Sequence, residues 1–113
     1  MLNHHPMPFC NDWERELHFE KHGYKFRAVD QFEYERMADV FMFGEQGKDT
    51  HECIRTNAPD RVRLDFGTKY FCVSRLTPKP ECLRTFYPVK RTTVAYHGGL
   101  ASYMQYECGR IDL

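Results

Sequence analysis

The chain has 113 residues, with 16 Lys and Arg against 16 Asp and Glu and a hydrophobic content of 42%. This length fits a single domain that can bury a hydrophobic core, and the apolar content excludes a disordered chain. Zero net charge argues against a bulk nucleic-acid binder. No apolar run approaches the ~18 residues that a transmembrane helix needs, so we expect no membrane partner.

The N-terminal residues predict a lead that is not a classical signal peptide. Residues 1–11 are polar and contain prolines, so we expect them to form a flexible lead. They lack the positively charged segment and following apolar stretch of a signal peptide. Export by a dedicated secretion machine stays compatible with this composition. A single α+β domain is expected over residues 12–113.

Two helices are predicted next, each with its own start and stop signals. Asp12 is a candidate N-cap of the first helix, and Gly23 is its candidate stop. Asp30 begins the second helix, where Glu33 completes a capping box, and Gly44 ends it. Apolar residues recur at helical spacing along this second helix at Tyr34, Met37, Ala38 and Phe41.

The apolar period then changes from helical to alternating, which predicts strands. Residues 45–57 are polar and predict a loop with a short strand, and Gly67-Thr68 predicts a tight turn. Longer strands are expected at 61–66, 70–74, 83–89 and 92–96. Residues 100–106 form either a short helix or a last strand. The order predicts an α+β fold, with N-terminal helices packed on an antiparallel sheet of about four strands.

The cysteines predict free thiols. There are five of them, an odd number, and their wide spacing contains no close pair of the kind that zinc sites use. We therefore expect buried or incidental free thiols in a reducing compartment. These residues are Cys10, Cys53, Cys72, Cys82 and Cys108.

His18 and His22 stand four residues apart, which places them on one side of a helix. Three interpretations are open: metal ligands, acid/base or substrate-positioning groups, and structural residues. The zinc-protease motif requires Glu directly after the first histidine, where this chain has Phe19. In the metal interpretation a third ligand is His51 or Cys53. Histidine suits proton transfer because its pKa lies near neutrality.

Arginines are concentrated on the predicted sheet, at Arg61, Arg63, Arg75 and Arg84, and Arg55 precedes it. They form either a solvated sheet face or an electrostatic clamp for phosphate, since the planar guanidinium suits bidentate contact. In the strand Leu83–Pro88, alternation places Arg84 with Phe86 and places Thr85 with Tyr87. Thr85 and Tyr87 can hydrogen-bond a phosphate or ribose, or belong to an ordinary strand. Lys90 is a further candidate for substrate binding.

Four segments carry a resemblance by their order: HFEKHG (18–23), EYERMADVF (33–41), RVRLDFGTKYFCV (61–73) and LRTFYP (83–88). The chain from about residue 13 to 108 resembles the C-terminal toxin domains of bacterial polymorphic and contact-dependent secretion systems. These domains are grouped with the barnase, EndoU, colicin and RelE-like nucleases. The resemblance implies N-terminal helices on a curved four-stranded antiparallel sheet. It also implies metal-independent RNA cleavage, in which the 2′-hydroxyl of the RNA is the nucleophile.

Matching positions imply a catalytic set and a binding set. The catalytic residues would be His18, His22, Arg63, Arg84, Thr85 and Tyr87. The substrate-binding residues would be Arg61, Arg55 and Lys90. The prediction is an endoribonuclease toxin without cofactor or metal, with RNA as substrate and a cognate immunity protein as partner. It would act in the cytoplasm after delivery by a secretion system.

The chain departs from the toxin pattern in its Pro-rich loop at 77–81 and in the ending Pro88-Val89-Lys90. Two alternatives therefore stay open beside the nuclease. One is a non-catalytic binding or interaction module of the same fold. The other is a small metal-binding protein that uses histidine and cysteine ligands.

Overall fold

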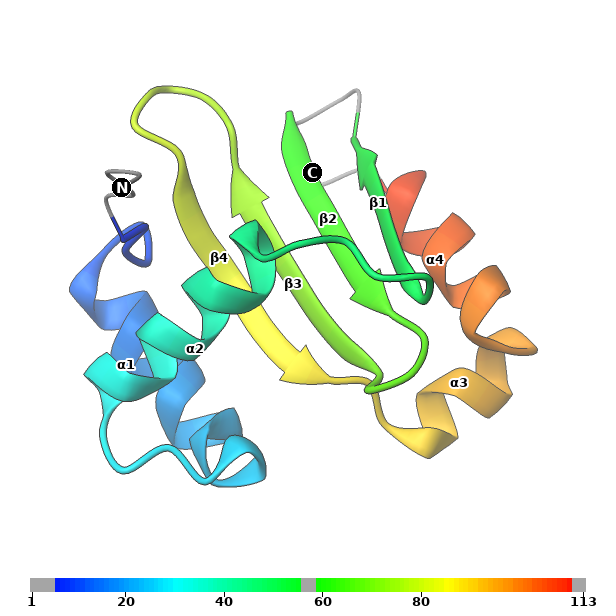
Figure 1. The fold of residues 1–113 in the computed structure, drawn as a ribbon, viewed down its shortest axis with the longest axis horizontal. Coiled ribbons are helices and arrows are strands. Elements are labelled where there is room, and N and C mark those ends of the chain that lie inside the picture. Colours follow the sequence, from blue (N-terminus) through cyan, green and yellow to red (C-terminus); the bar gives the residue numbers. More distant parts are fainter. Residues whose placement is uncertain (1–5, 56–58, 111–113) are drawn as a thin grey trace.

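The computed structural model describes residues 6–55 and 59–110, and in these ranges it shows four helices and a four-stranded antiparallel sheet (Figure 1). The predicted α+β fold is thereby confirmed. Residues 1–5 of the predicted lead, 56 and 57 of the predicted loop and 111–113 of the predicted domain lie outside the described residues. The elements are α1 (Asp12–His22), the 3₁₀ turn η1 (Gly23–Phe26), α2 (Gln31–Phe43), β1 (Thr50–Ile54), β2 (Asp60–Asp65), β3 (Tyr70–Arg75), β4 (Cys82–Pro88), α3 (Arg91–His97) and α4 (Leu100–Cys108).

The first two helices begin at side-chain caps. The side chain of Asn11 accepts a hydrogen bond of 2.8 Å from the amide three residues on, so the cap of α1 is Asn11 rather than the predicted Asp12. At α2 the carboxylate of Asp30 accepts from the Glu33 amide at 2.8 Å, and the Glu33 carboxylate accepts from the Val29 amide at 3.0 Å. These caps pair amides that the first turn of a helix leaves without partners.

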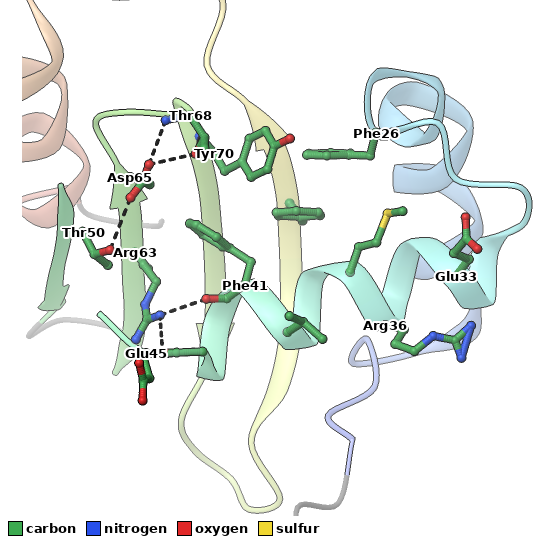
Figure 2. Close-up of a pocket in the computed structure, with 14 residues that line it drawn as sticks. Phe26, Glu33, Arg36, Phe41, Glu45, Thr50, Arg63, Asp65, Thr68 and Tyr70 are labelled. Atoms are coloured by element: carbon green, nitrogen blue, oxygen red, sulfur yellow. Dashed lines mark hydrogen bonds between the residues drawn. The ribbon is translucent and has the colours of Figure 1, made fainter. Parts of the chain in front are cut away.

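The sheet has the simple order β1-β2-β3-β4, in which every strand pairs with its neighbour along the chain. The turn between β2 and β3 falls at the predicted Gly67-Thr68, where the Asp65 carboxylate accepts a hydrogen bond of 2.7 Å from the Thr68 amide (Figure 2). Short connections of this kind fix the register of each strand pair. They also leave β1 and β4 as the two edges of the sheet.

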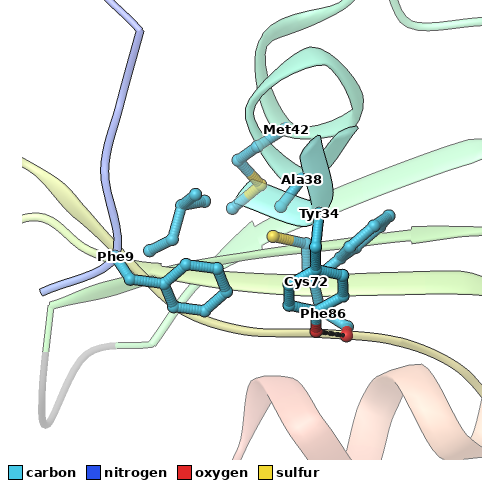
Figure 3. Packing of buried hydrophobic residues seen from close by; sticks show 7 residues of the cluster. Phe9, Tyr34, Ala38, Met42, Cys72 and Phe86 are labelled. Atoms are coloured by element: carbon cyan, nitrogen blue, oxygen red, sulfur yellow. Dashed lines mark hydrogen bonds between the residues drawn. The ribbon is translucent and has the colours of Figure 1, made fainter. Parts of the chain in front are cut away.

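Helices cover both faces of the sheet, but over different strands (Figure 1). α2 packs on β3 and β4, with a core of Phe9, Tyr34, Ala38, Met42, Cys72, Leu83 and Phe86 (Figure 3). α4 packs on β2 from the opposite face, with a core of Val62, Leu64, Phe71, Val73, Val89, Tyr103 and Met104. The opposite face therefore keeps β3 and β4 less covered than β2.

The C-terminal part is helical, so the strand predicted at residues 92–96 is wrong. Thr92, Thr93 and Val94 favour strands by propensity, but Gly98 ends a helix there in the left-handed conformation with φ at 81°. Val94 packs against the α4-side core, and this tertiary contact outweighs local propensity. Residues 100–106, left open between helix and strand, lie in α4. None of the helices in the described part is long and apolar enough to cross a membrane.

Two disulfides correct the prediction of free thiols. Cys10 is bonded to Cys82 in β4, and Cys53 in β1 is bonded to Cys108 in α4. Among the described residues Cys72 alone carries a free thiol, and it is buried. Spacing along the chain did not indicate these pairs because each one joins segments that meet only in the folded protein.

The segment expected as a flexible lead is docked on the domain from residue 7 onward. Phe9 is only 3% exposed, and it forms a parallel bridge with Leu83 of β4. Two carboxylates of α2 accept hydrogen bonds from this segment. Asp39 accepts from the Met7 amide and Glu35 accepts from the Phe9 amide, both at 2.9 Å. These residues therefore belong to the domain rather than to a lead.

Candidate functional site

A cleft of about 630 Å³ lies on the α4 face, over β3 and β4. Its floor includes Phe71 and Val73 of β3, and its walls come from α1, β4 and α4. We call it the His18 cleft. The polar and charged side chains that line it include Glu14, His18, Arg55, Arg75, Arg84, Thr85, Tyr87, Glu107 and Arg110.

A β-bulge in β4 sets the direction of Arg84. The pairing passes from Val73↔Thr85 to Ser74↔Leu83, so Arg84 is the extra residue of the bulge, opposite the step between Val73 and Ser74. A bulge interrupts strict alternation and re-aims side chains. Arg84 and Thr85 consequently line the same cleft, which corrects the prediction that they face opposite sides.

His18 projects from α1 and is held at both ring nitrogens. Its Nε2 lies 3.2 Å from a carboxylate oxygen of Glu14, and its Nδ1 lies 3.4 Å from the hydroxyl oxygen of Thr85. Burial lowers the pKa of His18 below its ordinary 6.5, although the Glu14 carboxylate opposes this shift. The imidazole is therefore neutral near pH 7. With Nε2–H donating to Glu14, Nδ1 is the acceptor that faces Thr85.

His22 lies one turn further along α1, beside the cleft rather than in its lining. Its ring contacts that of Tyr87 at a centroid separation of 5.2 Å, and its Nδ1 lies 3.3 Å from the Lys25 ammonium. Burial, followed by the charge of Lys25, lowers the pKa of His22 to about 4. Lys90 contributes to the same lowering, so this predicted binding residue lies near His22.

A hydrogen-bonded chain joins the cleft to α4. The Tyr87 hydroxyl lies 2.9 Å from the Tyr103 hydroxyl, which donates to a Glu107 carboxylate oxygen at 2.7 Å. The other Glu107 oxygen accepts from Arg55 at 2.6 Å. Burial raises the pKa of the Tyr87 phenol, so that phenol stays protonated at neutral pH. Sequence reasoning missed Tyr103 and Glu107 because it left α4 undecided between helix and strand.

Asp60 of β2 connects Arg55, which ends the hydrogen-bonded chain from Tyr87, to Arg84. It is only 1% exposed, and one of its oxygens lies 2.7 Å from Arg84 Nη1 and 3.3 Å from Arg55 Nη1. Arg55, predicted as a binding residue, and Arg84, predicted as a catalytic residue, are thereby tied to one buried carboxylate. The side chain of Arg55 is 5% exposed, whereas that of Arg84 is 43% exposed.

Arg61 and Arg63 are not brought to the cleft, in contrast to the prediction that they bind phosphate beside His18. Arg63 Nη1 donates to the carbonyls of Phe41 and Gly44, each at 2.9 Å, at the end of α2 (Figure 2). Arg61 donates to Glu81 at 2.7 Å. Both arginines lie on the face of the sheet that α2 covers. The prediction failed because alternation shows which residues share a face, but not which face a helix covers. Arg63 also lines a second hollow of about 710 Å³ on that face.

The alternative metal site is not assembled by the residues proposed for it. Cys53 is bonded to Cys108 and cannot offer a thiolate, while His51 stacks on Phe66 in the β1 region at a centroid separation of 3.9 Å. Over residues 6–55 and 59–110, no group of three or more His, Cys, Asp or Glu side chains is placed to hold a metal ion.

The assembled cleft combines two chemical capacities. A neutral histidine, oriented by a carboxylate, can accept a proton, and the surrounding guanidiniums can bind an anion. Four arginines line the cleft against two glutamates, so its electrostatic character is cationic although the whole chain is neutral. No model of a known protein family matches the chain, and no curated protein matches it in sequence.

Proposed function

We propose that the protein is a metal-independent endoribonuclease whose active site is the His18 cleft. The observation that carries this proposal is the line Glu14–His18–Thr85, set among arginines in one cleft. Cleavage of RNA by its own 2′-hydroxyl needs a group that moves protons and cations that stabilise the phosphate. The cleft supplies both from the protein's own side chains.

In this mechanism neutral His18 accepts the proton of the 2′-hydroxyl at Nδ1. The 2′-oxygen bonds to phosphorus, the bond to the 5′-oxygen breaks, and the imidazolium or water returns a proton to that oxygen. The products are a 2′,3′-cyclic phosphate and a 5′-hydroxyl. Arg84 stabilises the charge on the phosphate, while Thr85 and Tyr87 orient it by hydrogen bonds.

The wider biology follows the resemblance to secreted toxin domains. The substrate is RNA in the cytoplasm of a target cell, reached by a secretion system, and a cognate immunity protein protects the producer. The two disulfides support this assignment, because such bonds form and persist outside the reducing cytosol.

The test is cleavage of total RNA by the oxidised protein in excess EDTA. We expect discrete cleavage by the wild type and a loss of about 10²- to 10⁴-fold in the His18→Ala variant, as for removal of a general base. His51→Ala is the matched control, since His51 lies in β1 and does not line the cleft. Intact RNA with folded wild type, or equal rates for wild type and His18→Ala, would contradict the proposal.

The second candidate is a non-catalytic binding module, because one residue of the implied site serves the fold instead of the reaction. The Arg55 guanidinium is buried and bonded to Glu107 and Asp60, so it acts as a structural tie within the protein. If folded wild type leaves RNA intact, RNA binding without cleavage would support this module. The same result would exclude the enzymatic role of His18.

A further inference from the structure

Arg75 is one of two arginines of the cleft, with Arg110, that the implied catalytic and binding sets leave out. It ends β3 and follows Phe71 and Val73 at alternate positions, so it shares their face and lines the His18 cleft with them. Its Nε is buried and has no hydrogen-bond partner among the described residues. A buried donor without an acceptor is unfavourable, and in a cleft it indicates a ligand acceptor.

The position of Arg75 relative to His18 follows from the register of β3 and β4. Val73 pairs with Thr85, the contact of His18, whereas Arg75 pairs with Cys82. Arg75 is thus two residues beyond Val73, about 6.6 Å along the strand at ~3.3 Å per residue. That displacement is on the scale of one nucleotide step along an extended strand.

We propose that Arg75 binds the phosphate next to the scissile one, so that the cleft takes an extended RNA strand rather than a single phosphodiester. The planar fork of a guanidinium matches phosphate oxygens, and the arginine excess in the cleft favours a second anion. This inference deepens the proposed function and rests on the cleft being the RNA site.

The experiment measures binding of two strands that cannot be cleaved because every 2′-hydroxyl is methylated. ApU has one phosphodiester and ApUpApU has three, and calorimetric titration gives the affinity of each. We expect Arg75→Gln to weaken the longer strand about tenfold, as for one lost charge-assisted contact, and to leave the shorter one unchanged. The slope of log affinity against log salt for the longer strand should fall by about 0.7, since each phosphate contact contributes that much for single strands.

Two further variants separate a binding role from a structural one. Arg36→Gln removes the same charge from an exposed position of α2 that lines the hollow on the other face, and it should change neither affinity. Arg75→Lys keeps the charge without the fork, so the salt slope should hold while part of the affinity is lost. The urea midpoint of Arg75→Gln should match that of the wild type.

The outcomes keep this inference distinct from the proposed function. The role of Arg75 is overturned if Arg75→Gln binds the longer strand as tightly as the wild type does. It is also overturned if the wild type does not bind the longer strand. If RNA is cleaved in EDTA while Arg75→Gln binds normally, only the subsite is wrong. If the Arg75 effect is found without cleavage, the phosphate site stands and the enzymatic proposal fails.

Discussion

Arg63 and Arg75 lie on neighbouring strands of one sheet, and they face opposite sides. On the α2 face, the guanidinium of Arg63 bonds two carbonyls at the end of a helix and the carboxylate of Glu52, and the residue is 4% exposed. On the α4 face, Arg75 borders a cleft and has a buried Nε without a partner among the described residues. For these two arginines, the element that covers the face decides whether the side chain is structural or available to a ligand.

The same contrast holds for how the helices are attached. α2 is held by a large aromatic core and by Arg63. α4 has a buried apolar cluster of its own, to which the Cys53–Cys108 disulfide and the polar chain through Glu107 are added. The α4 face therefore combines apolar packing with polar groups that open onto the cleft.

The largest expected effect comes from releasing α4. Replacing Cys53 and Cys108 together by serine should lower the free energy of unfolding by about 4 kcal/mol, from the chain entropy of a cross-link spanning 55 residues. Urea denaturation of the oxidised proteins measures this loss. The comparison variant replaces Cys10 and Cys82 by serine, because that disulfide spans a similar sequence separation of 72 residues. A loss below about 1 kcal/mol for the α4 pair would contradict the stabilising role of this cross-link.

A smaller effect should separate the two kinds of arginine. Arg63→Met removes the donor to two carbonyls at the end of α2 and breaks the buried arginine's ion pair with Glu52, so we expect about 3 kcal/mol of destabilisation. Arg84→Met should lower the free energy of unfolding by about 1 kcal/mol, because the Arg84 side chain is 43% exposed and Asp60 still accepts a hydrogen bond from Arg55. Urea midpoints give both values. RNA cleavage per folded molecule should follow the reverse order, and a larger stability loss for Arg84→Met would contradict the comparison.

The smallest effect expected is a shift in the pH dependence of cleavage. The neutral form of His18 is the active one, so the rate should fall as the pH falls through the His18 pKa, which lies below 6.5. Glu14 raises that pKa, so Glu14→Gln should move the acid limb to still lower pH. Profiles of kcat/KM against pH test this sign. An acid limb that moves to higher pH in Glu14→Gln would contradict the assigned role of the Glu14–His18 pair.

Local signals predicted the elements that depend on local contacts. The Asp30 cap and the apolar stripe of α2 act within a few residues, and both were predicted correctly. The reciprocal bond of the predicted capping box differs, since the Glu33 carboxylate accepts from the Val29 amide rather than from the Asp30 amide. The alternation in β2 and β3 likewise gave the strands, and with them the α+β fold. α3 was mistaken for a strand because its β-branched residues are held in a helix by packing on the sheet.

The candidate site was predictable only in part. His18 and Thr85 were both singled out, although their contact spans 67 positions along the chain and could not be derived from either segment alone. The bulge at Arg84 and the Asp60 tie have no sequence signature that we recognise. Arg75 is different, since alternation was enough to place it on the same face of the sheet as Val73, and the structure shows that this face carries the cleft.

The docked N-terminal segment has a consequence for self-association of the protein. An edge strand with unpaired amides and carbonyls is a template for another chain, and β4 is an edge of this sheet. Here the Leu83 amide donates to the Pro8 carbonyl at 2.8 Å, and its carbonyl accepts from the Cys10 amide at 3.0 Å. The Cys10–Cys82 bond holds this segment against Leu83. Oxidation therefore keeps the Leu83 position of the β4 edge paired within the chain, where another strand would otherwise pair, and reduction releases this constraint.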